Sequence, residues 1–527
     1  MWPFIATILV YQTWPSDRAD RQISSISPPS APRDGEPAAD QHRPVRHGHR
    51  PALAGPVVFP RISPGGRARI HTTLTVMRIG HQDTGGAAPP WAAPRAGGAV
   101  RARLRLPGSK SMTNRALVLA ALAAGPTEIL GPLWARDSRL MAGALRALGA
   151  SVDLAPSPGA AWRVSPGWTG TDTRVDVGNA GTVMRFVPPV ATLARAAVEF
   201  HGDPRAAQRP VAAIITALRE IGADIDDGGR GAIPFTVRGT GSLPGGAVTV
   251  DASASSQLVS GLLLAAPRYE KGLEVRHRGP RAPSAPHIAM TVQMLREAGA
   301  AVETATAGSA GPPGGVGGVP DTWYIHPGVI SSPAIIVQPD LVNSAPFLAA
   351  ALLTGGSVTI LGWPAQTSQP ARQILDVFTQ LGGCAAMGPD GLTVTGSGQV
   401  RAVTADLTDC SEISLVVGAL AALADGPSVL TGIGHQRLQE TDRLGALATE
   451  LNALGGSVTE LPDGVRIEPR PLRASRPFDT YDDHRLVMAA AVLGLAVPGL
   501  LVANVATVGK TFPDFTRRWA AMLERAP

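Results

Sequence analysis

The sequence predicts an α/β protein built from repeated units of about 75 residues, each with two helices and several short strands. An amphipathic helix that ends in a glycine before a short strand occurs five times, with Gly149, Gly222, Gly299, Gly382 and Gly455 at the helix ends. These glycines are 73, 77, 83 and 73 residues apart. Six other helical segments alternate with this set, and short Val/Ile/Thr-rich segments run between the helices. Such regular spacing indicates a repeat architecture.

The two sets of helices are expected to lie in different surroundings. Each glycine of the first set is placed to take the left-handed conformation that ends a helix. The second set is rich in Ala, Leu and Val on nearly every side, as in 114–125 (NRALVLAALAAG) and 484–497 (HRLVMAAAVLGLAV). Helices of this kind are expected to be buried on most sides.

Length and composition limit the possible classes of protein. The chain has 527 residues, of which 17% are charged and 44% are hydrophobic, which suits two or three globular domains. A collagen-like, disordered or disulfide-based protein is excluded. The two cysteines, Cys384 and Cys410, form no metal-binding spacing, so we expect neither a disulfide framework nor a metal site.

The net charge of +6 lies mostly in the first part of the chain. Residues 1–97 hold 11 Arg, no Lys, 6 acidic residues and 14 Pro, and they show no apolar period. We therefore expect a disordered N-terminal extension, with no signal peptide and with Met77 as a candidate start. The rest of the chain has a net charge of only +1, so a nucleic-acid-binding face is not expected.

One segment, 486–508, is uncharged and long enough to span a membrane. Pro498 and Gly499 interrupt it in the middle. It therefore predicts a helix, a turn and a buried strand, and no membrane association.

Polar clusters occur where the predicted helices begin. Ser, Thr, Asp and Asn are ordinary N-cap residues at such positions. Most of the same clusters also contain lysines or arginines. Cations are mildly unfavourable at the positive end of a helix dipole, so capping does not explain these basic residues. Together with free backbone N–H groups they predict a site for a polyanionic substrate. The clusters are PGSKSMTNR (107–115), GNAGTVMR (178–185), SASSQ (253–257), TDCSE (408–412), QETDR (439–443), YDDHR (481–485) and GKTFPDF (509–515).

Two further features of these clusters bear on chemistry. PGSKS is not a phosphate-binding Walker A loop, because Ser109 separates the glycine from the lysine. Only three of the 47 basic residues are lysines, and two of them, Lys110 and Lys510, lie in the clusters whereas Lys271 does not. This bias indicates that a compact ammonium is needed at those two positions. Acids among the cations could be held ionised for proton transfer or could serve as salt bridges.

The motifs PGSKSMTNRALVLAALAAG, GNAGTVMR, SSQ, ETDRL, DDHR and GKTFPDF resemble those of the 5-enolpyruvylshikimate-3-phosphate synthase family, over residues 98–522. The resemblance implies an inside-out α/β barrel of two domains, with three βαβαββ repeats in each and the active site in the cleft. One domain would hold residues 110–338 and the other residues 98–109 and 339–527. It also implies transfer of the enolpyruvyl group of phosphoenolpyruvate to the 5-hydroxyl of shikimate 3-phosphate, with release of phosphate and no cofactor.

The same resemblance implies a role for each site residue. Lys110, Asp409, Glu440 and His484 would be catalytic, with Asp409 as the base at the hydroxyl. Shikimate 3-phosphate would contact Lys110, Ser111, Arg115, Ser255, Ser256, Gln257, Ser284, Asp409, His435 and Gln439. Phosphoenolpyruvate would contact Lys110, Gly181, Thr182, Arg209, Gln257, Arg443, Arg485 and Lys510.

Four residues depart from the family pattern. His287 stands where Tyr is common, and His435 where Asn is common. Gln439 replaces a basic residue that meets the substrate phosphate, which removes a charge-assisted contact. Phe186 replaces a Pro, and we expect it to alter access for phosphonate analogues such as glyphosate.

Two alternatives remain. The sister transferase acting on UDP-N-acetylglucosamine uses a loop cysteine, which HGDPRAAQRP (201–210) lacks. A non-catalytic member of the same fold is the other, since a fold alone does not fix a function. We expect a cytoplasmic monomer whose partners are its two small-molecule substrates.

Overall fold

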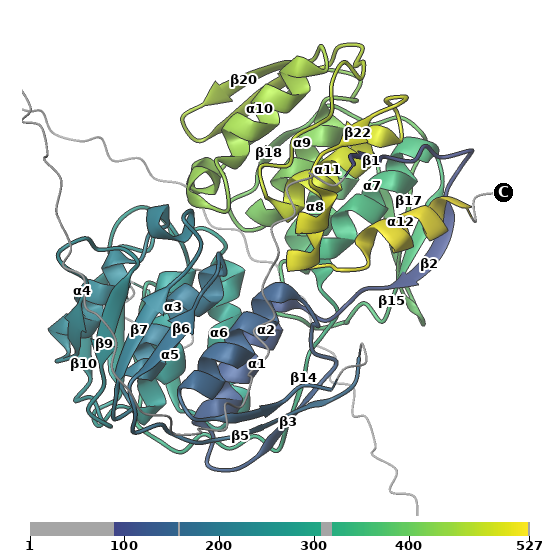
Figure 1. Ribbon diagram of the computed structural model, residues 1–527. Helices are drawn as coiled ribbons and strands as arrows, with labels where there is room; N and C mark the ends of the chain where they lie inside the picture. Colours follow the sequence, from purple (N-terminus) through teal and green to yellow (C-terminus); the bar gives the residue numbers. More distant parts are fainter. Residues whose placement is uncertain (1–88, 156–158, 307–318, 525–527) are drawn as a thin grey trace, which may run out of the picture. The chain divides into compact units, whose positions relative to one another are not determined.

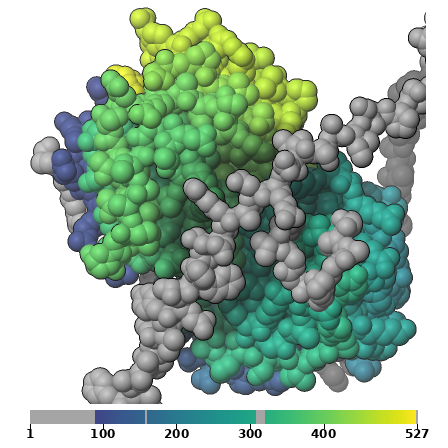
Figure 2. Space-filling model, turned by 180° about the vertical axis from the view of Figure 1, so that it is seen from behind, coloured from purple at the N-terminus to yellow at the C-terminus, as the bar shows by residue number. Residues whose placement is uncertain are grey.

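The computed structural model describes residues 89–155, 159–306 and 319–524. The greater part of the predicted extension, with Met77, lies outside this range. The described chain contains two hydrophobic cores. The continuous core comprises buried residues between positions 112 and 337, and the split core comprises buried residues at 93–106 and 341–523. Figure 2 shows the surface around the continuous core mainly in teal and the surface around the split core mainly in green and yellow.

Six helices are buried on nearly every side, as their composition predicts. In the continuous core they are α1 (Lys110–Leu122), α3 (Gly181–Ala191) and α5 (Gln257–Ala265). In the split core they are α7 (Ala345–Thr354), α9 (Ser414–Ala421) and α11 (His484–Gly494). Small residues among the large apolar side chains, which in α1, α7, α9 and α11 are mostly alanines, let these helices pack closely against one another.

The five predicted helix–glycine–strand elements are confirmed. Each of the five glycines has a φ between +88° and +105°, a conformation that side chains with a Cβ rarely adopt. The helices are α2 (Arg136–Ala147), α4 (Ala212–Glu220), α6 (Ala285–Glu297), α8 (Ala371–Gln380) and α10 (Arg443–Ala453). The strands that follow them are β4 (Ser151–Asp153), β8 (Asp224–Asp226), β12 (Val302–Ala305), β16 (Cys384–Gly388) and β20 (Ser457–Leu461).

Five four-stranded sheets share one topology, in which a parallel pair is followed by two antiparallel neighbours. Those of the continuous core are β14-β3-β5-β4, β6-β7-β9-β8 and β10-β11-β13-β12. Their remaining strands are β3 (Thr127–Leu130), β5 (Trp162–Ser165), β6 (Thr173–Asp176), β7 (Ala197–His201), β9 (Phe235–Arg238), β10 (Gly246–Val250), β11 (Leu273–His277), β13 (Thr322–Ile325) and β14 (Ala334–Ile336).

The split core carries the sheets β16-β17-β15-β2 and β18-β19-β21-β20. Figure 1 shows the early strand β2, in purple-blue, at the edge of a sheet whose other strands are green, and it pairs with β15. Their remaining strands are β2 (Arg101–Arg105), β15 (Ser357–Leu361), β17 (Gly391–Thr395), β18 (Thr404–Asp406), β19 (Ser428–Thr431) and β21 (Gly464–Glu468).

The sixth unit differs from the other five. Its sheet contains only β1 (Trp91–Ala92) and β22 (Leu501–Val502), and the bridge from Phe478 to Val502 extends it. Helix α12 (Phe515–Glu524) follows, and no described strand comes after it. The segment 486–508 forms most of α11 and a turn, as predicted, but the expected buried strand is only β22, with Leu501 exposed, and a 3-10 helix (Val505–Lys510) follows it. No described helix is long and apolar enough to span a membrane.

Strand β1 corrects the expected end of the disordered extension, which the sequence places at residue 97. The Ala93 N–H donates to Leu500 O over 2.9 Å, and the Ala93 side chain is buried against Gly494. A side chain at position 494 would collide with Ala93, so this glycine makes room for the N-terminal segment. Because residues 1–97 are rich in proline, their composition does not predict this short strand, whose partner lies about 400 residues later.

The chain passes between the two cores at two places, and these segments are hydrogen-bonded to each other. Gly108 and Pro339 form an antiparallel bridge. The Ser109 N–H donates to Gln338 O over 2.8 Å, and the Asp340 N–H donates to Pro107 O over 2.9 Å. The first crossing ends at the start of α1, where the lysine of the PGSKS motif lies.

Candidate active site

A polar pocket lies where helices of both cores begin. Its lining includes the first residues of α1, α3 and α5 from the continuous core and of α10 and α11 from the split core. Short side chains cap several of these helices, as when Asp442 accepts from the Gly445 N–H over 3.0 Å. The remaining free N–H groups and the helix dipoles make the pocket favourable for anions.

Glu440 lies between two cations at one side of the pocket. Its Oε1 accepts from Lys510 Nζ over 2.9 Å, and its Oε2 accepts from Arg443 Nη2 over 2.9 Å. Burial alone would raise the pKa of Glu440, but the positive charges of Lys510 and Arg443 hold it well below its ordinary value. The carboxylate is therefore ionised. Arg443 also pairs with the buried Asp483 over 2.7 Å, which orients its guanidinium.

Lys110 brings a further cation to the pocket. Its Nζ is 3.4 Å from Oδ2 of the buried Asp137, and its main-chain N–H donates to Asp340 Oδ2 over 3.1 Å. Asp137 Oδ1 has no hydrogen-bond partner among the described residues. The ammonium is thus tethered on one side, and the rest of it is open to the pocket.

Three arginines of the pocket are bound only to neutral acceptors within the described chain. Arg115 donates to Thr291 Oγ1 over 2.7 Å, Arg209 to Asn179 Oδ1 over 2.9 Å, and Arg485 to Asn343 Oδ1 over 3.2 Å. Burial lowers the pKa of Arg115 to about 9. A buried cation without a carboxylate partner is costly, so a site with three of them is suited to a ligand that supplies the negative charge.

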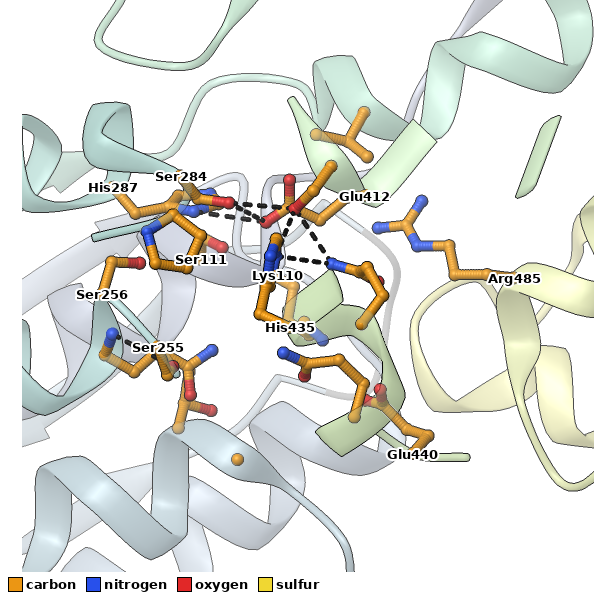
Figure 3. A pocket seen from close by; sticks show the side chains of 18 of the residues that line it. Lys110, Ser111, Ser255, Ser256, Ser284, His287, Glu412, His435, Glu440 and Arg485 are labelled. Atoms are coloured by element: carbon orange, nitrogen blue, oxygen red, sulfur yellow. Dashed lines mark hydrogen bonds and ion pairs between the residues drawn. The ribbon is translucent and has the colours of Figure 1, made fainter. Parts of the chain in front are cut away.

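His287, Ser284 and Glu412 form a small cluster at the opposite side (Figure 3). His287 Nδ1 is 3.3 Å from Glu412 Oε1, and Ser284 Oγ donates to the same oxygen over 3.4 Å. Burial would raise the pKa of Glu412, but the interaction with His287, a main-chain hydrogen bond and the charge of Arg485 hold it below the ordinary value. Glu412 Oε2 has no described partner, so this carboxylate can accept a proton from a ligand.

His484, at the first position of α11, is almost fully buried. Neither of its ring nitrogens is hydrogen-bonded to a described residue. Burial, with the charge of Arg485, lowers the pKa of His484 well below its ordinary value, so the ring is neutral. A neutral imidazole here can accept one hydrogen bond and donate another. Among the described residues, no group of three His, Cys, Asp or Glu side chains is placed to hold a metal ion.

These features can be compared with those of known proteins. The family model of EPSP synthase (3-phosphoshikimate 1-carboxyvinyltransferase) matches residues 94–519. The chain belongs to the EPSP synthase family. It is 47% identical over 442 residues to the 3-phosphoshikimate 1-carboxyvinyltransferase of Kocuria rhizophila, covering 82% of this chain and 96% of that protein. The protein of the same name from Mycobacterium ulcerans is 46% identical, with 82% and 98% covered.

Solved structures agree with membership of the EPSP synthase family. The EPSP synthase of Acinetobacter baumannii has a TM-score of 0.65 and 25% identity, covering 82% of this chain and 97% of that one. The enolpyruvyl transferase NikO of Streptomyces tendae has a TM-score of 0.61 at 18% identity, covering 81% and 96%, which supports the fold alone.

The pocket of this EPSP synthase family member brings together most of the residues that the sequence singles out. It is lined by Lys110, Ser111, Arg115, Gly181, Thr182, Arg209, Ser255, Ser256, Gln257, Ser284, His435, Gln439, Glu440, Arg443, His484 and Arg485. Lys510 lies directly behind this lining, bound to Glu440 and to Asn179 O. Phe186 is buried, with its ring 5.1 Å from the Arg115 guanidinium carbon, and is not part of the lining.

Asp409 is placed differently from its expected role. It does not line the pocket, and its Oδ2 accepts from Arg281 Nη2 over 2.7 Å. The carboxylate that the same cluster brings into the pocket is Glu412. A short 3-10 turn at Ser411–Ile413 precedes α9 and turns Glu412 inward, while Asp409 is bonded to Arg281 in the loop between β11 and α6.

The pocket also contains residues to which the sequence assigns no role at the site. They are Ser109, Pro283, His287, Asp340, Val342, Gln369, Ser411, Glu412 and Gln436. The clusters PGSKS and TDCSE contain Ser109, Ser411 and Glu412, and His287 is noticed only as a departure from the family. Asp340 and Gln369 carry no comparable sequence signal, because they depend on the paired crossings: Gln369 Nε2 donates to Pro339 O over 2.9 Å.

Proposed function

We propose that the chain transfers the enolpyruvyl group of phosphoenolpyruvate to the 5-hydroxyl of shikimate 3-phosphate and releases phosphate, within aromatic amino acid biosynthesis. The observation that carries this proposal is the set of buried arginines without carboxylate partners, Arg115, Arg209 and Arg485. Two phosphorylated carboxylic acids would supply the missing negative charge. Membership of the EPSP synthase family supports the same reaction.

The reaction begins when the 5-hydroxyl gives its proton to a base and its oxygen adds to C2 of phosphoenolpyruvate. We assign Glu412 as the base, because it is ionised, lines the pocket and has an oxygen free of described partners. Asp409 is expected to hold Arg281 and not to act as the base.

Protonation of C3 accompanies this addition and gives a methyl group in a tetrahedral adduct. Lys110 is the proposed donor, since its ammonium faces the pocket and is tethered on one side only. Loss of phosphate then needs a proton to leave the methyl group. Glu440, ionised between two cations, is the proposed acceptor, and neutral His484 is placed to assist.

The cations that surround these groups stabilise the charge of the adduct. Arg209, Arg443, Arg485 and Lys510 come from four separate segments, so they meet a single anion only in the folded chain. Fixed charges of this kind need no reorganisation during the reaction and stabilise the transition state more than water does.

The proposal also covers the domains, the active form and the location of the protein. The two cores support a division into one domain of residues 110–338 and another of residues 98–109 and 339–527, to which β1 is added. We also propose that the active form is a monomer that acts without nucleic acid or membrane. Both cysteines are unpaired, which suits the reducing cytoplasm.

A phosphate-release assay tests the proposal. The full chain should release phosphate when phosphoenolpyruvate and shikimate 3-phosphate are both present, and not with either alone. UDP-N-acetylglucosamine in place of shikimate 3-phosphate is the control for the sister reaction. Release only with UDP-N-acetylglucosamine, or with neither acceptor, would reject the assignment.

A further inference from the structure

Gln439 links the two cores at the edge of the pocket through two arginines. Its main-chain oxygen accepts from Arg205 Nε and Nη2, each over 3.2 Å. Its side-chain Oε1 accepts from Arg209 Nη2 over 3.2 Å. Both arginines belong to the segment between β7 and α4 of the continuous core, whereas Gln439 precedes α10 of the split core.

Arg209 depends on few contacts for its orientation. Its Nη1 donates to Asn179 O over 2.8 Å and to Asn179 Oδ1 over 2.9 Å. Its Nε is buried without a described hydrogen-bond partner, and the side chain is only 3% exposed. Asn179 therefore holds one end of the guanidinium, and the Gln439 amide holds the other.

The second end of this guanidinium lies in a narrow space. A Cβ at position 181 would be 2.7 Å from Arg209 Nη2, so the glycine there is needed for the arginine to reach its place. Gln439 contacts the same nitrogen from the split core. A residue at position 439 can thus direct Arg209 into or away from the pocket that both residues line.

We propose that Gln439 is a positioning residue for Arg209, and that the property required of it is a neutral hydrogen-bond acceptor. This inference rests on the proposed function, in which Arg209 binds phosphoenolpyruvate. A lysine or arginine at position 439 has no acceptor, and it would place another positive charge against Arg209. The resemblance implies a contact of Gln439 with shikimate 3-phosphate, whereas the bond that its amide oxygen makes in the structure is to Arg209, so we expect its main effect at the neighbouring anion site.

Two substitutions in the full chain separate this role from a general structural one. Gln439→Met keeps the length of the side chain and removes the acceptor. It should raise KM for phosphoenolpyruvate about tenfold, the usual scale for losing a hydrogen bond to a charged group, and leave KM for shikimate 3-phosphate within about twofold. Gln439→Lys should raise KM for phosphoenolpyruvate at least as much, while KM for shikimate 3-phosphate stays unchanged or falls.

Gln293→Met is the matched control, because Gln293 is exposed and bonds only to Glu297, so both constants should match those of the wild type. The inference is overturned if Gln439→Met leaves KM for phosphoenolpyruvate within twofold, or if both KM values rise together. It is also overturned if Gln439→Lys improves phosphoenolpyruvate binding. Failure of the proposed function would instead appear as a wild-type chain that releases no phosphate.

Discussion

The Lys510 ammonium donates to the Glu440 carboxylate over 2.9 Å, and about 95% of each side chain is buried. The same carboxylate binds Arg443 from its other oxygen. This makes Glu440 both a proton acceptor of low pKa and the only described carboxylate paired with Lys510. Its removal is expected to affect catalysis and folding together, and the two effects need separate measurements.

Glu440→Gln should reduce kcat by roughly 100- to 10,000-fold, because the group that accepts a proton is lost. It should also lower the melting temperature, since buried Lys510 loses its counter-charge and Arg443 keeps only Asp483. Glu450→Gln is the matched control: Glu450 is buried against Arg476 and Tyr481, outside the pocket. It should lower the melting temperature and leave kcat unchanged. Equal loss of kcat in both variants would contradict the catalytic role.

The three lysines should respond differently to exchange for arginine. Lys110→Arg should lose most of its turnover, because a larger guanidinium fits poorly beside Asp137 and gives up a proton far less readily. Lys510→Arg should mainly raise KM for phosphoenolpyruvate. Lys271, outside the pocket, should tolerate the change. Steady-state kinetics with both substrates decide this, and near-normal turnover of Lys110→Arg would remove that residue from the mechanism.

Glu412→Gln and Asp409→Asn distinguish the two candidate bases. Glu412→Gln should lower kcat by about 100-fold or more, with melting temperature nearly unchanged. Asp409→Asn should keep kcat within about threefold, because its partly exposed ion pair with Arg281 contributes little. The opposite ranking in a phosphate-release assay would return the role of base to Asp409.

His435 should make the fold sensitive to mild acid. Burial lowers the pKa of His435 to about 4, with Arg443 adding to the effect, whereas the unfolded chain has its ordinary value of 6.5. Between these values the unfolded state binds the proton and the folded state does not, so stability falls as pH falls. Between pH 7 and pH 5 the free energy of unfolding, measured with denaturant, should fall by ~2 kcal/mol less in His435→Asn than in the wild type. An identical loss in both proteins would show that His435 does not contribute.

Strand β1 sets a limit to N-terminal truncation. A chain that begins at Met77 should keep full activity and the wild-type melting temperature, because β1 and all pocket residues remain. A chain that begins at Gly98 loses the pairing of β1 with β22 and the buried Ala93, and should melt roughly 5 °C lower. Equal melting temperatures would show that β1 adds no stability.

Local sequence signals predict the repeated units well, because each is encoded within a short stretch. A glycine at the end of an amphipathic helix, as at Gly149, requires no knowledge of distant residues. Strand β1 could not be predicted in this way, since its partner β22 is about 400 residues later and only two residues pair.

The pocket residues also divide into those that local sequence identifies and those that depend on distant parts of the chain. Helix-start clusters identify Lys110, Arg443 and Arg485 directly, but the choice between Asp409 and Glu412 depends on one irregular turn. The 3-10 geometry of Ser411–Ile413 rotates the chain before α9 begins, and neither propensity nor periodicity specifies that rotation. Likewise, the contact between Gln439 and Arg209 joins residues 230 positions apart.

The two hydrogen-bonded crossings also impose an order on assembly during synthesis. Strand β2 leaves the ribosome early, yet its segment must wait for partners such as Thr354, which follows Val100 by 254 residues. All residues of the continuous core emerge in the meantime and can fold while β2 remains unpaired. Arg101, Arg103 and Arg105 lie on one exposed face of this strand. Such charges disfavour pairing of this strand with a strand of a neighbouring nascent chain on the same messenger RNA until its own partner has been synthesised.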